Sequence, residues 1–274
     1  MLRLTLMALF ASTFAVQASG GALRADLERI AHVPIYFGHQ SVGANLLEGV
    51  RELADSAGVP LRIVESPRAG ALAAGSIAHA FLAENGEPLR KLASFKTALG
   101  EGSNADIALM KFCYVDVNGD TDASALFERY RAMITELRAK NPRTTFVHVT
   151  LPLTTAQTGW KALAKRMLGR APYGTIENLR REEYNTLLRR AYRGREPIFD
   201  LARVESTAPD GSTASVNWSG SSAPVMVAAY TDDGGHLNAR GKLLAARELI
   251  AVLAAATKPL QKIDYSATPV RASR

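Results

Sequence analysis

The stretch Val33-Pro34-Ile35-Tyr36-Phe37-Gly38-His39-Gln40-Ser41-Val42-Gly43 carries the clearest structural signal of this chain. Its apolar first half predicts a buried strand, and the residues after Ser41 have the apolar spacing of an amphipathic helix. Ser41 is therefore predicted to lie at a strand-to-helix turn with its hydroxyl exposed. Such a turn also presents backbone N–H groups to an anion that develops during a reaction.

A second motif, Asp232-Asp233-Gly234-Gly235-His236-Leu237-Asn238, follows near the other end of the chain. A serine hydroxyl is a weak nucleophile until a base accepts its proton, and an imidazole does this best when a carboxylate orients its other ring nitrogen. Asp233 and His236 supply that pair within one tight turn. The alternative interpretation is a turn that begins a helix, with Asp233 and Asn238 as capping residues.

Apolar runs typical of strands alternate along the chain with segments of helical period. This alternation predicts a parallel sheet flanked by helices, within one large domain. Two stretches of weaker pattern, 68–102 and 208–222, are predicted to be long surface loops. Strands are expected near 33–38, 60–65, 106–114, 144–151 and 197–199, and helices near 42–56, 122–139, 175–192 and 238–255.

The first residues have the pattern of a secretory signal peptide. Met1-Leu2-Arg3 precedes an apolar run from Leu4 to Val16, and cleavage is expected near Ala18. No other segment is long and apolar enough to span a bilayer, so we expect an exported chain, periplasmic or secreted, without membrane contact after cleavage. The expected organisation is a signal peptide at 1–18, a folded domain at 19–257 and a C-terminal tail at 258–274.

The composition, 47% hydrophobic and 22% charged, is that of a globular protein able to bury a large core. The formal net charge is +7, and the stretch between Trp160 and Glu196 holds ten basic residues against four acidic ones. This stretch is interpreted as a solvated helix face or as a surface that attracts a polyanion or an acidic glycan. No nucleic-acid-binding motif is present, so nucleic acid is not an expected partner. The single thiol, Cys113, is expected at a buried strand position.

Together the two motifs resemble those of the SGNH hydrolase superfamily, also called GDSL-type esterases. The resemblance runs from about Val33 to Ala255 and implies a flavodoxin-like, three-layer α/β/α sandwich with a central parallel sheet. It also implies that Ser41 is the nucleophile, that Asp233 orients the imidazole and that His236 is the general base.

The chain departs from the family pattern where an oxyanion would be bound. His39-Gln40-Ser41 stands where the family has Gly-Asp-Ser, and Val115 stands where it has an oxyanion-binding Asn. Loss of one such donor lowers turnover by a factor on the order of 10²–10³. The glycine that supplies another donor in the family corresponds to Gly70 or Gly75.

Gln40 and Lys111 are candidates for the missing donor. Gln40 carries a side-chain amide next to Ser41. Lys111 lies in an apolar run, where an unpaired ammonium is costly, so it is expected to reach a polar crevice or to pair with an acid such as Asp116. For His39 we expect either contact with substrate or a structural role beside the turn.

Residues 116–122 resemble part of a calcium loop, because oxygen ligands alternate along them. Phe127 occupies the place where such a loop requires an acidic ligand. We therefore interpret the stretch as a turn in which Thr121 or Asp122 caps the next helix. No metal and no cofactor are expected.

These observations favour a serine esterase that removes small acyl groups, acetyl above all, from a carbohydrate or a cell-envelope glycan through an acyl-enzyme on Ser41. Two alternatives stay open. One is a catalytically silent glycan-binding module of the same fold. The other is an O-acyltransferase, in which a sugar hydroxyl instead of water accepts the acyl group. The acyl group, the alcohol and the oligomeric state stay open at this point.

Overall fold

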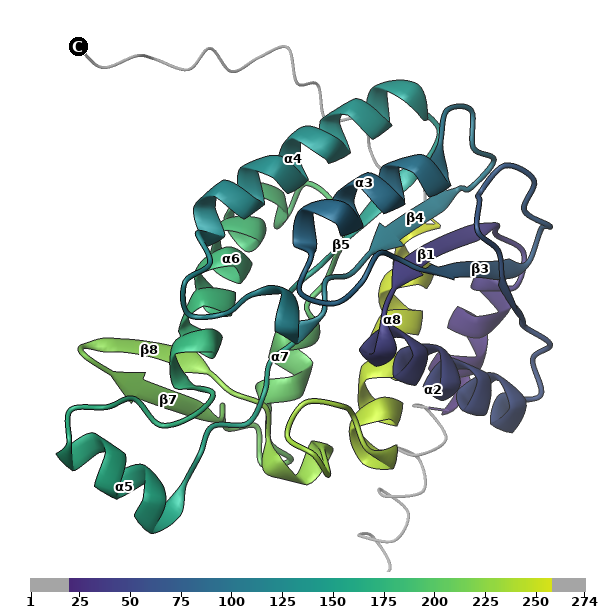
Figure 1. Ribbon diagram of the computed structural model, residues 1–274. Coiled ribbons are helices and arrows are strands. Elements are labelled where there is room, and N and C mark those ends of the chain that lie inside the picture. Colours follow the sequence, from purple (N-terminus) through teal and green to yellow (C-terminus); the bar gives the residue numbers. More distant parts are fainter. Residues whose placement is uncertain (1–19, 258–274) are drawn as a thin grey trace, which may run out of the picture.

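The computed structural model describes residues 20–257, so the expected signal peptide and C-terminal tail fall outside the described residues. Its centre is a six-stranded sheet in the order β2-β3-β1-β4-β5-β6, in which every neighbouring pair is parallel (Figure 1). This confirms the predicted parallel sheet. The strands are β1 (Ile35–His39), β2 (Arg62–Glu65), β3 (Ser76–Phe81), β4 (Ile107–Met110), β5 (Thr145–Val149) and β6 (Ile198–Phe199).

Helices cover both faces of the sheet and bury a separate core against each. Ile35 and Phe37 of β1 face the core under α2 and α8, whereas Tyr36 between them faces the core under α3, α4 and α6. The alternation along one strand makes three layers, helix, sheet and helix (Figure 1). The helices are α2 (Ser41–Ala57), α3 (Pro88–Leu99), α4 (Ala123–Lys140), α5 (Gly159–Met167), α6 (Thr175–Tyr192), α7 (Leu201–Ser206) and α8 (Ala239–Ala256), with a further helix at residues 20–30 and two 3₁₀ turns, η1 (Tyr114–Asp116) and η2 (Ala228–Tyr230).

Local sequence signals set the ends of the helices near the predicted places. Asp122 caps α4 by accepting a hydrogen bond from the Ala125 N–H at 2.8 Å, which confirms its predicted role. Asn238 caps α8 by accepting from the N–H groups of Arg240 and Gly241. Gly58 ends α2 in a left-handed conformation with φ 64°, which glycine adopts without strain. No helix among residues 20–257 is both long and apolar enough to cross a bilayer.

The predicted loop over 68–102 is wrong, because it contains β3 and α3. The strand β3 reads Ser-Ile-Ala-His-Ala-Phe, and its small residues give little strand signal by themselves. Pairing with β1 on one side and β2 on the other stabilises it instead. The second predicted loop, 208–222, is wrong in part, since it holds most of an antiparallel hairpin formed by β7 (Ser215–Trp218) and β8 (Ser221–Pro224).

Candidate active site

The fold brings the two sequence motifs together at the carboxyl end of β1. Ser41 is the first residue of α2, and its Oγ lies 3.0 Å from His236 Nε2. His236 Nδ1 in turn lies 2.6 Å from Asp233 Oδ2. Because a carboxylate only accepts hydrogen bonds, Nδ1 carries the proton and Nε2 is free to accept the Ser41 hydroxyl proton. The three side chains form one hydrogen-bonded line from carboxylate to hydroxyl.

The Asp233 carboxylate is held in place by backbone N–H groups of the turn that contains it. Asp233 Oδ1 accepts hydrogen bonds from the backbone N–H groups of His236 at 2.8 Å and Gly235 at 2.9 Å. These two donors, together with the His236 ring, hold the pKa of Asp233 well below its usual range. The Thr231 hydroxyl adds a third hydrogen bond to Oδ1 at 3.2 Å. Asp233 is therefore ionised at neutral pH, and it orients the imidazole.

Two glycines let other side chains approach the Asp-His turn, which we define as residues 231–238. Gly234 has φ 88°, and a Cβ there would lie 2.8 Å from the Thr155 hydroxyl. A Cβ on Gly235 would lie 2.7 Å from the ring of Tyr114. The Tyr114 ring stands edge-on to the His236 imidazole, with 5.6 Å between the ring centroids. The Tyr114 ring thus packs beside the imidazole of His236 and limits its rotation.

The first turn of α2 offers backbone donors next to Ser41. The N–H groups of Ser41 and Val42 lie at the start of the helix, where no preceding helical carbonyl is available to them. The Gln40 side chain has a different use. Its amide nitrogen donates to the Leu82 carbonyl and, at 3.0 Å, to the Ala83 carbonyl. Both amide N–H groups are thereby engaged, which leaves none for an oxyanion.

Gly70 and Gly75, predicted as alternative oxyanion donors, lie at the opposite end of the strands from Ser41. Gly75 immediately precedes β3, and a Cβ on it would meet the Ala31 carbonyl ahead of β1 at 2.1 Å. Ala69, next to Gly70, accepts a hydrogen bond from Ser103 ahead of β4. Because the strands are parallel, residues ahead of them lie at the end away from Ser41. This prediction is therefore wrong, and the cause is the missed strand β3.

His39 lies fully buried and contacts protein on every side. Its Nδ1 lies 2.8 Å from the Gln40 carbonyl, and its Nε2 lies 3.0 Å from His79 Nδ1. Burial lowers the pKa of His39 to about 3, so the ring is neutral. A Cβ on Gly43 would lie 2.3 Å from the His39 Cβ, so glycine is required there. Of the two roles expected for His39, the structure shows the structural one.

Lys111 does not pair with Asp116, contrary to one of the expectations. Its ammonium is buried and donates to the Phe112 carbonyl at 2.8 Å, and burial lowers its pKa to about 8. Asp116 instead binds Lys91 of α3 at 2.7 Å and accepts from the N–H groups of Cys113 and Gly86. This buried cluster joins the loops after β3 and β4. These loops lie at the same end of the sheet as the candidate site, the carboxyl end of the strands.

Two further side chains, Val115 and Glu205, bear on what this site can do. Val115 is 43% exposed and carries no hydrogen-bond donor, so the side chain at the family's Asn position cannot stabilise an oxyanion. Glu205 of α7 is buried, and burial raises its pKa to about 8. One of its oxygens accepts from the Leu153 N–H at 2.6 Å, and the other has no hydrogen-bond partner among the described residues.

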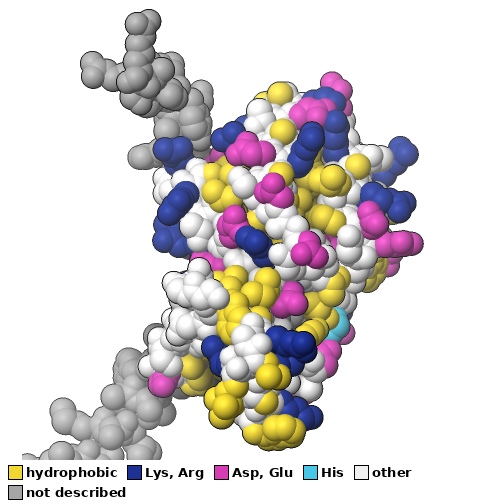
Figure 2. Space-filling view, turned by 60° about the vertical axis from the view of Figure 1, so that its left-hand side comes forward, with side chains coloured by type: hydrophobic (Ala, Val, Ile, Leu, Met, Phe, Trp, Pro, Cys, Tyr) yellow, Lys and Arg dark blue, Asp and Glu magenta, His cyan; other side chains and the backbone are white. Residues whose placement is uncertain are grey.

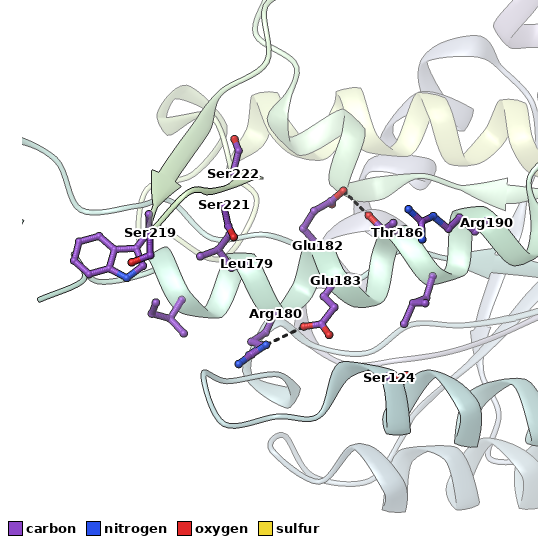
Figure 3. Close-up of a pocket in the computed structure, with 13 residues that line it drawn as sticks. Ser124, Leu179, Arg180, Glu182, Glu183, Thr186, Arg190, Ser219, Ser221 and Ser222 are labelled. Atoms are coloured by element: carbon purple, nitrogen blue, oxygen red, sulfur yellow. Dashed lines mark hydrogen bonds and ion pairs between the residues drawn. The ribbon is translucent and has the colours of Figure 1, made fainter.

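A groove of about 590 Å³ lies elsewhere, between α6, the start of α4 and the β7–β8 hairpin (Figure 3). Its wall includes Trp218 and Arg180, and Arg180 is paired with Glu183. None of Ser41, Asp233 and His236 lines it. Within residues 20–257 no group of three or more His, Cys, Asp or Glu side chains that could hold a metal ion is found.

Sequence reasoning missed Tyr114, Thr231 and Lys91 as parts of this site. Thr231 precedes the Asp-x-x-His motif by two positions, and a hydroxyl so close to a carboxylate was a usable signal. Tyr114 and Lys91 had no such signal. Tyr114 contacts a histidine more than a hundred residues away, and Lys91 lies in the segment that was predicted to be a loop.

No protein-family model matches this chain, and no curated protein matches it in sequence. Solved structures do match. A protein of Streptococcus pneumonia, provisionally assigned as a platelet activating factor, is 12% identical with a TM-score of 0.50 and covers 90% of this chain and 99% of its own. An acetyl xylan esterase, AlAXEase, is 16% identical with a TM-score of 0.48 and covers 80% and 98%. A lipolytic protein of Desulfitobacterium hafniense, provisionally placed in the G-D-S-L family, is 9% identical with a TM-score of 0.45 and covers 80% and 98%.

At these identities the likeness is one of fold. The first match spans nearly all of both chains. This chain therefore shares its overall fold with that structure, and its own central parallel sheet between two layers of helices is the α/β/α sandwich that the sequence predicted.

Proposed function

We propose that this protein is a serine esterase that hydrolyses small acyl esters through an acyl-enzyme on Ser41. The observation that carries the proposal is the hydrogen-bonded line from Asp233 through His236 to Ser41. A hydroxyl and a carboxylate on the two nitrogens of one imidazole are the arrangement that activates a serine. An esterase suits this site because an ester releases an alkoxide that His236 can protonate.

In the acylation step, the Ser41 Oγ attacks the carbonyl carbon of the ester while its proton passes to His236 Nε2. The ionised Asp233 stabilises the imidazolium that forms. Negative charge develops on the carbonyl oxygen, and the backbone N–H groups of Ser41 and Val42 are the donors we propose for it. When the tetrahedral intermediate collapses, the bond to the alcohol oxygen breaks and His236 returns the proton to that oxygen.

In the deacylation step, a water molecule takes the place of the alcohol. His236 Nε2 accepts its proton as the water oxygen attacks the acyl carbon, and the proton then returns to Ser41 Oγ as the acyl bond breaks. The exposure of the site suits this step, because the side chains of His236 and Asp233 are 39% and 56% exposed. Water therefore has direct access to the acyl-enzyme.

The substrate we propose is an acetyl-type ester on a carbohydrate or cell-envelope glycan, hydrolysed by a protein exported to the periplasm or beyond. The proposal rests on the signal-peptide pattern of the first residues and on the family resemblance of the two motifs. Export is tested by the N-terminal sequence of the protein recovered from the producing cell, which should begin near residue 19. An uncleaved N-terminus would contradict it.

The test of the reaction compares Ser41→Ala with Ser56→Ala, a control at the far end of α2 whose hydroxyl bonds the Leu53 carbonyl. With p-nitrophenyl acetate, Ser41→Ala should abolish measurable turnover, and Ser56→Ala should keep it. A fluorophosphonate should label the wild-type protein at Ser41. Absence of labelling, with the fold intact, would favour the silent glycan-binding module. Acyl transfer to an added sugar in preference to water would favour the O-acyltransferase.

A further inference from the structure

Helix α5 exposes a row of large apolar side chains on one face. Trp160, Leu163, Met167 and Leu168 are 75%, 59%, 80% and 72% exposed, and they recur at the spacing of one helix face. Ala162, on the opposite face, is buried against the protein. Figure 1 shows α5 set apart from the sheet, and Figure 2 shows hydrophobic side chains gathered at that end of the molecule. Apolar groups exposed together in this way mark an interaction surface.

The charged residues of this segment are all basic. Residues 158–173 contain Lys161, Lys165, Arg166 and Arg170 and no acidic residue. Among the described residues, no ion pair within 4.0 Å involves any of these four side chains. Figure 2 shows dark-blue side chains beside the apolar ones at this end of the molecule. Helix α5 thus combines an apolar face with flanking positive charge.

Helix α6 shows that this is not a general property of the basic stretch. Arg180 pairs with Glu183, and Arg189 pairs with both Glu182 and Asp200. Two of the four arginines of α6 are therefore paired with carboxylates of the protein. The four cations of residues 158–173 have no such ion pair among the described residues, so they are available to a partner that carries negative charge next to an apolar layer.

Helix α5 contacts the β7–β8 hairpin, and the residues ahead of it contact the Asp-His turn. Arg166 donates to the Asn217 carbonyl at 3.0 Å and stacks over the ring of Trp218 in the β7–β8 hairpin. Ahead of α5, the Thr155 N–H donates to the Gly234 carbonyl at 2.9 Å, and after it the Tyr173 carbonyl accepts from the Gln157 N–H. A surface bound by α5 would therefore lie at a set position relative to the candidate active site.

We propose that α5 and the turn after it, residues 159–170, dock the protein on the surface of an anionic lipid bilayer. An amphipathic helix with Trp and Leu on one face and Lys and Arg beside them lies in the interface between headgroups and acyl chains. Trp is favoured at that depth, and the cations bind the anionic headgroups. This peripheral contact departs from the expectation that the exported chain leaves the membrane. It concerns binding and does not depend on the proposed esterase activity.

The test uses the full chain with Trp218→Phe, which leaves Trp160 as the sole tryptophan. Vesicles of phosphatidylglycerol should shift the Trp160 emission to the blue, and brominated lipid should quench it. Vesicles of phosphatidylcholine should do so at least tenfold more weakly. Because the signal comes from α5 itself, binding through the apolar N-terminal residues cannot produce it. Ser41→Ala should leave the titration unchanged.

Two variants separate the apolar from the charged contribution. Leu163→Ser with Met167→Ser should weaken partitioning at least tenfold, whereas Leu89→Ser, an equally exposed leucine on α3, should not. Lys161→Gln with Lys165→Gln should weaken it by roughly 25-fold, since each cation near an anionic surface contributes about fivefold. Arg90→Gln on α3 is the matched charge control. None of the α5 side chains changed is buried, so the fold should stay intact.

A second copy of this chain is the other occupant that could cover α5, and the same proteins distinguish it. Light scattering that shows a dimer, broken by Leu163→Ser with Met167→Ser and unaffected by vesicles, would overturn the proposal. So would a Trp160 emission that does not respond to phosphatidylglycerol. A monomer that shows the expected blue shift, lost in both α5 variants and kept in both controls, would support it.

Discussion

The carboxyl groups of Asp233 and Glu205 have pKa values that shift in opposite directions. Asp233 has an exposed side chain in the Asp-His turn, and the N–H groups of that turn lower its pKa. Glu205 lies buried with one hydrogen bond, from Leu153, and burial raises its pKa to about 8. Two residues further along the chain from Leu153, Thr155 bonds Gly234 of the turn.

Burial therefore raises the pKa of a carboxyl group that has few hydrogen-bond donors, and several donors lower the pKa of one that stays near water. An exposed carboxylate with several donors is a dependable anion for orienting His236. A buried carboxyl group with one donor is neutral over much of the ordinary pH range. Asp116 is the informative third case, because it is buried and yet pairs with Lys91.

The largest effect is expected from Asp233→Asn. The amide can still accept the two backbone N–H groups, so the turn should keep its shape, but it no longer selects the imidazole tautomer that accepts from Ser41. We expect kcat for an acetyl ester to fall by about 10⁴-fold while the protein stays folded. Asp232→Asn, on the neighbouring carboxylate, is the control and should keep most activity. Equal losses in both would break the distinction drawn for Asp233.

The next largest effect is expected from Asp116→Ala. Removing one partner leaves the buried Lys91 ammonium uncompensated, which should lower the free energy of unfolding by about 3–5 kcal/mol. Urea denaturation measures this. A double variant, Lys91→Met with Asp116→Leu, removes both charges and should be less destabilised than the single one. If the single variant is as stable as wild type, the buried cluster does not stabilise the fold.

Glu205→Gln should change how stability depends on pH. Because the folded pKa of Glu205, about 8, is raised above the usual 4.5, its contribution is fully present below pH 4.5 and is lost as pH rises through 8. Relative to the variant, the wild type should lose up to about 1.4 kcal/mol per pH unit between about pH 4.5 and pH 8, and little more above pH 8. Lys111 is present in both proteins, so the difference between their denaturation curves at pH 5, 6, 7 and 9 isolates Glu205. Parallel curves would contradict the raised pKa.

Asp233 should act in the opposite direction on the acid side. Its folded pKa is lowered from 3.8, so its contribution to stability is present above that value and is lost only as pH falls through the lowered pKa. The stability difference between wild type and Asp233→Asn should therefore stay constant from pH 7 to pH 5 and shrink below about pH 4. A difference that already changes at pH 6 would argue against this assignment.

The smallest effect is expected from Val115→Ala. The valine side chain offers no donor, so its truncation removes no stabilisation of an oxyanion, and an exposed position changes stability by about 0.5 kcal/mol or less. Activity on an acetyl ester should stay within about twofold of wild type. A tenfold loss would show that this side chain shapes the site in spite of lacking a donor.

Much of the fold was predictable because its signals are local. The strand before Ser41, the amphipathic helix after it, and the caps Asp122 and Asn238 depend on residues within a few positions of one another. The strand β3 was not predictable, since its Ser and Ala residues give weak local preference and its neighbours β1 and β2 stabilise it. Missing this strand also made the prediction for Gly70 and Gly75 wrong, because both residues precede β3 and lie at the end of the strands away from Ser41.

The sequence by itself determined the strand-to-helix turn at Ser41 and the Asp-x-x-His turn, because each is a local arrangement of backbone and short side chains. Only the tertiary structure decided that Lys91 pairs with Asp116, that Gln40 bonds the loop after β3, and that Tyr114 stands against His236. It also decided that the cations of α5 lack the acidic neighbours found along α6. The physical reason is that these contacts join residues far apart in the chain, where burial and close packing select the partner and local preference does not.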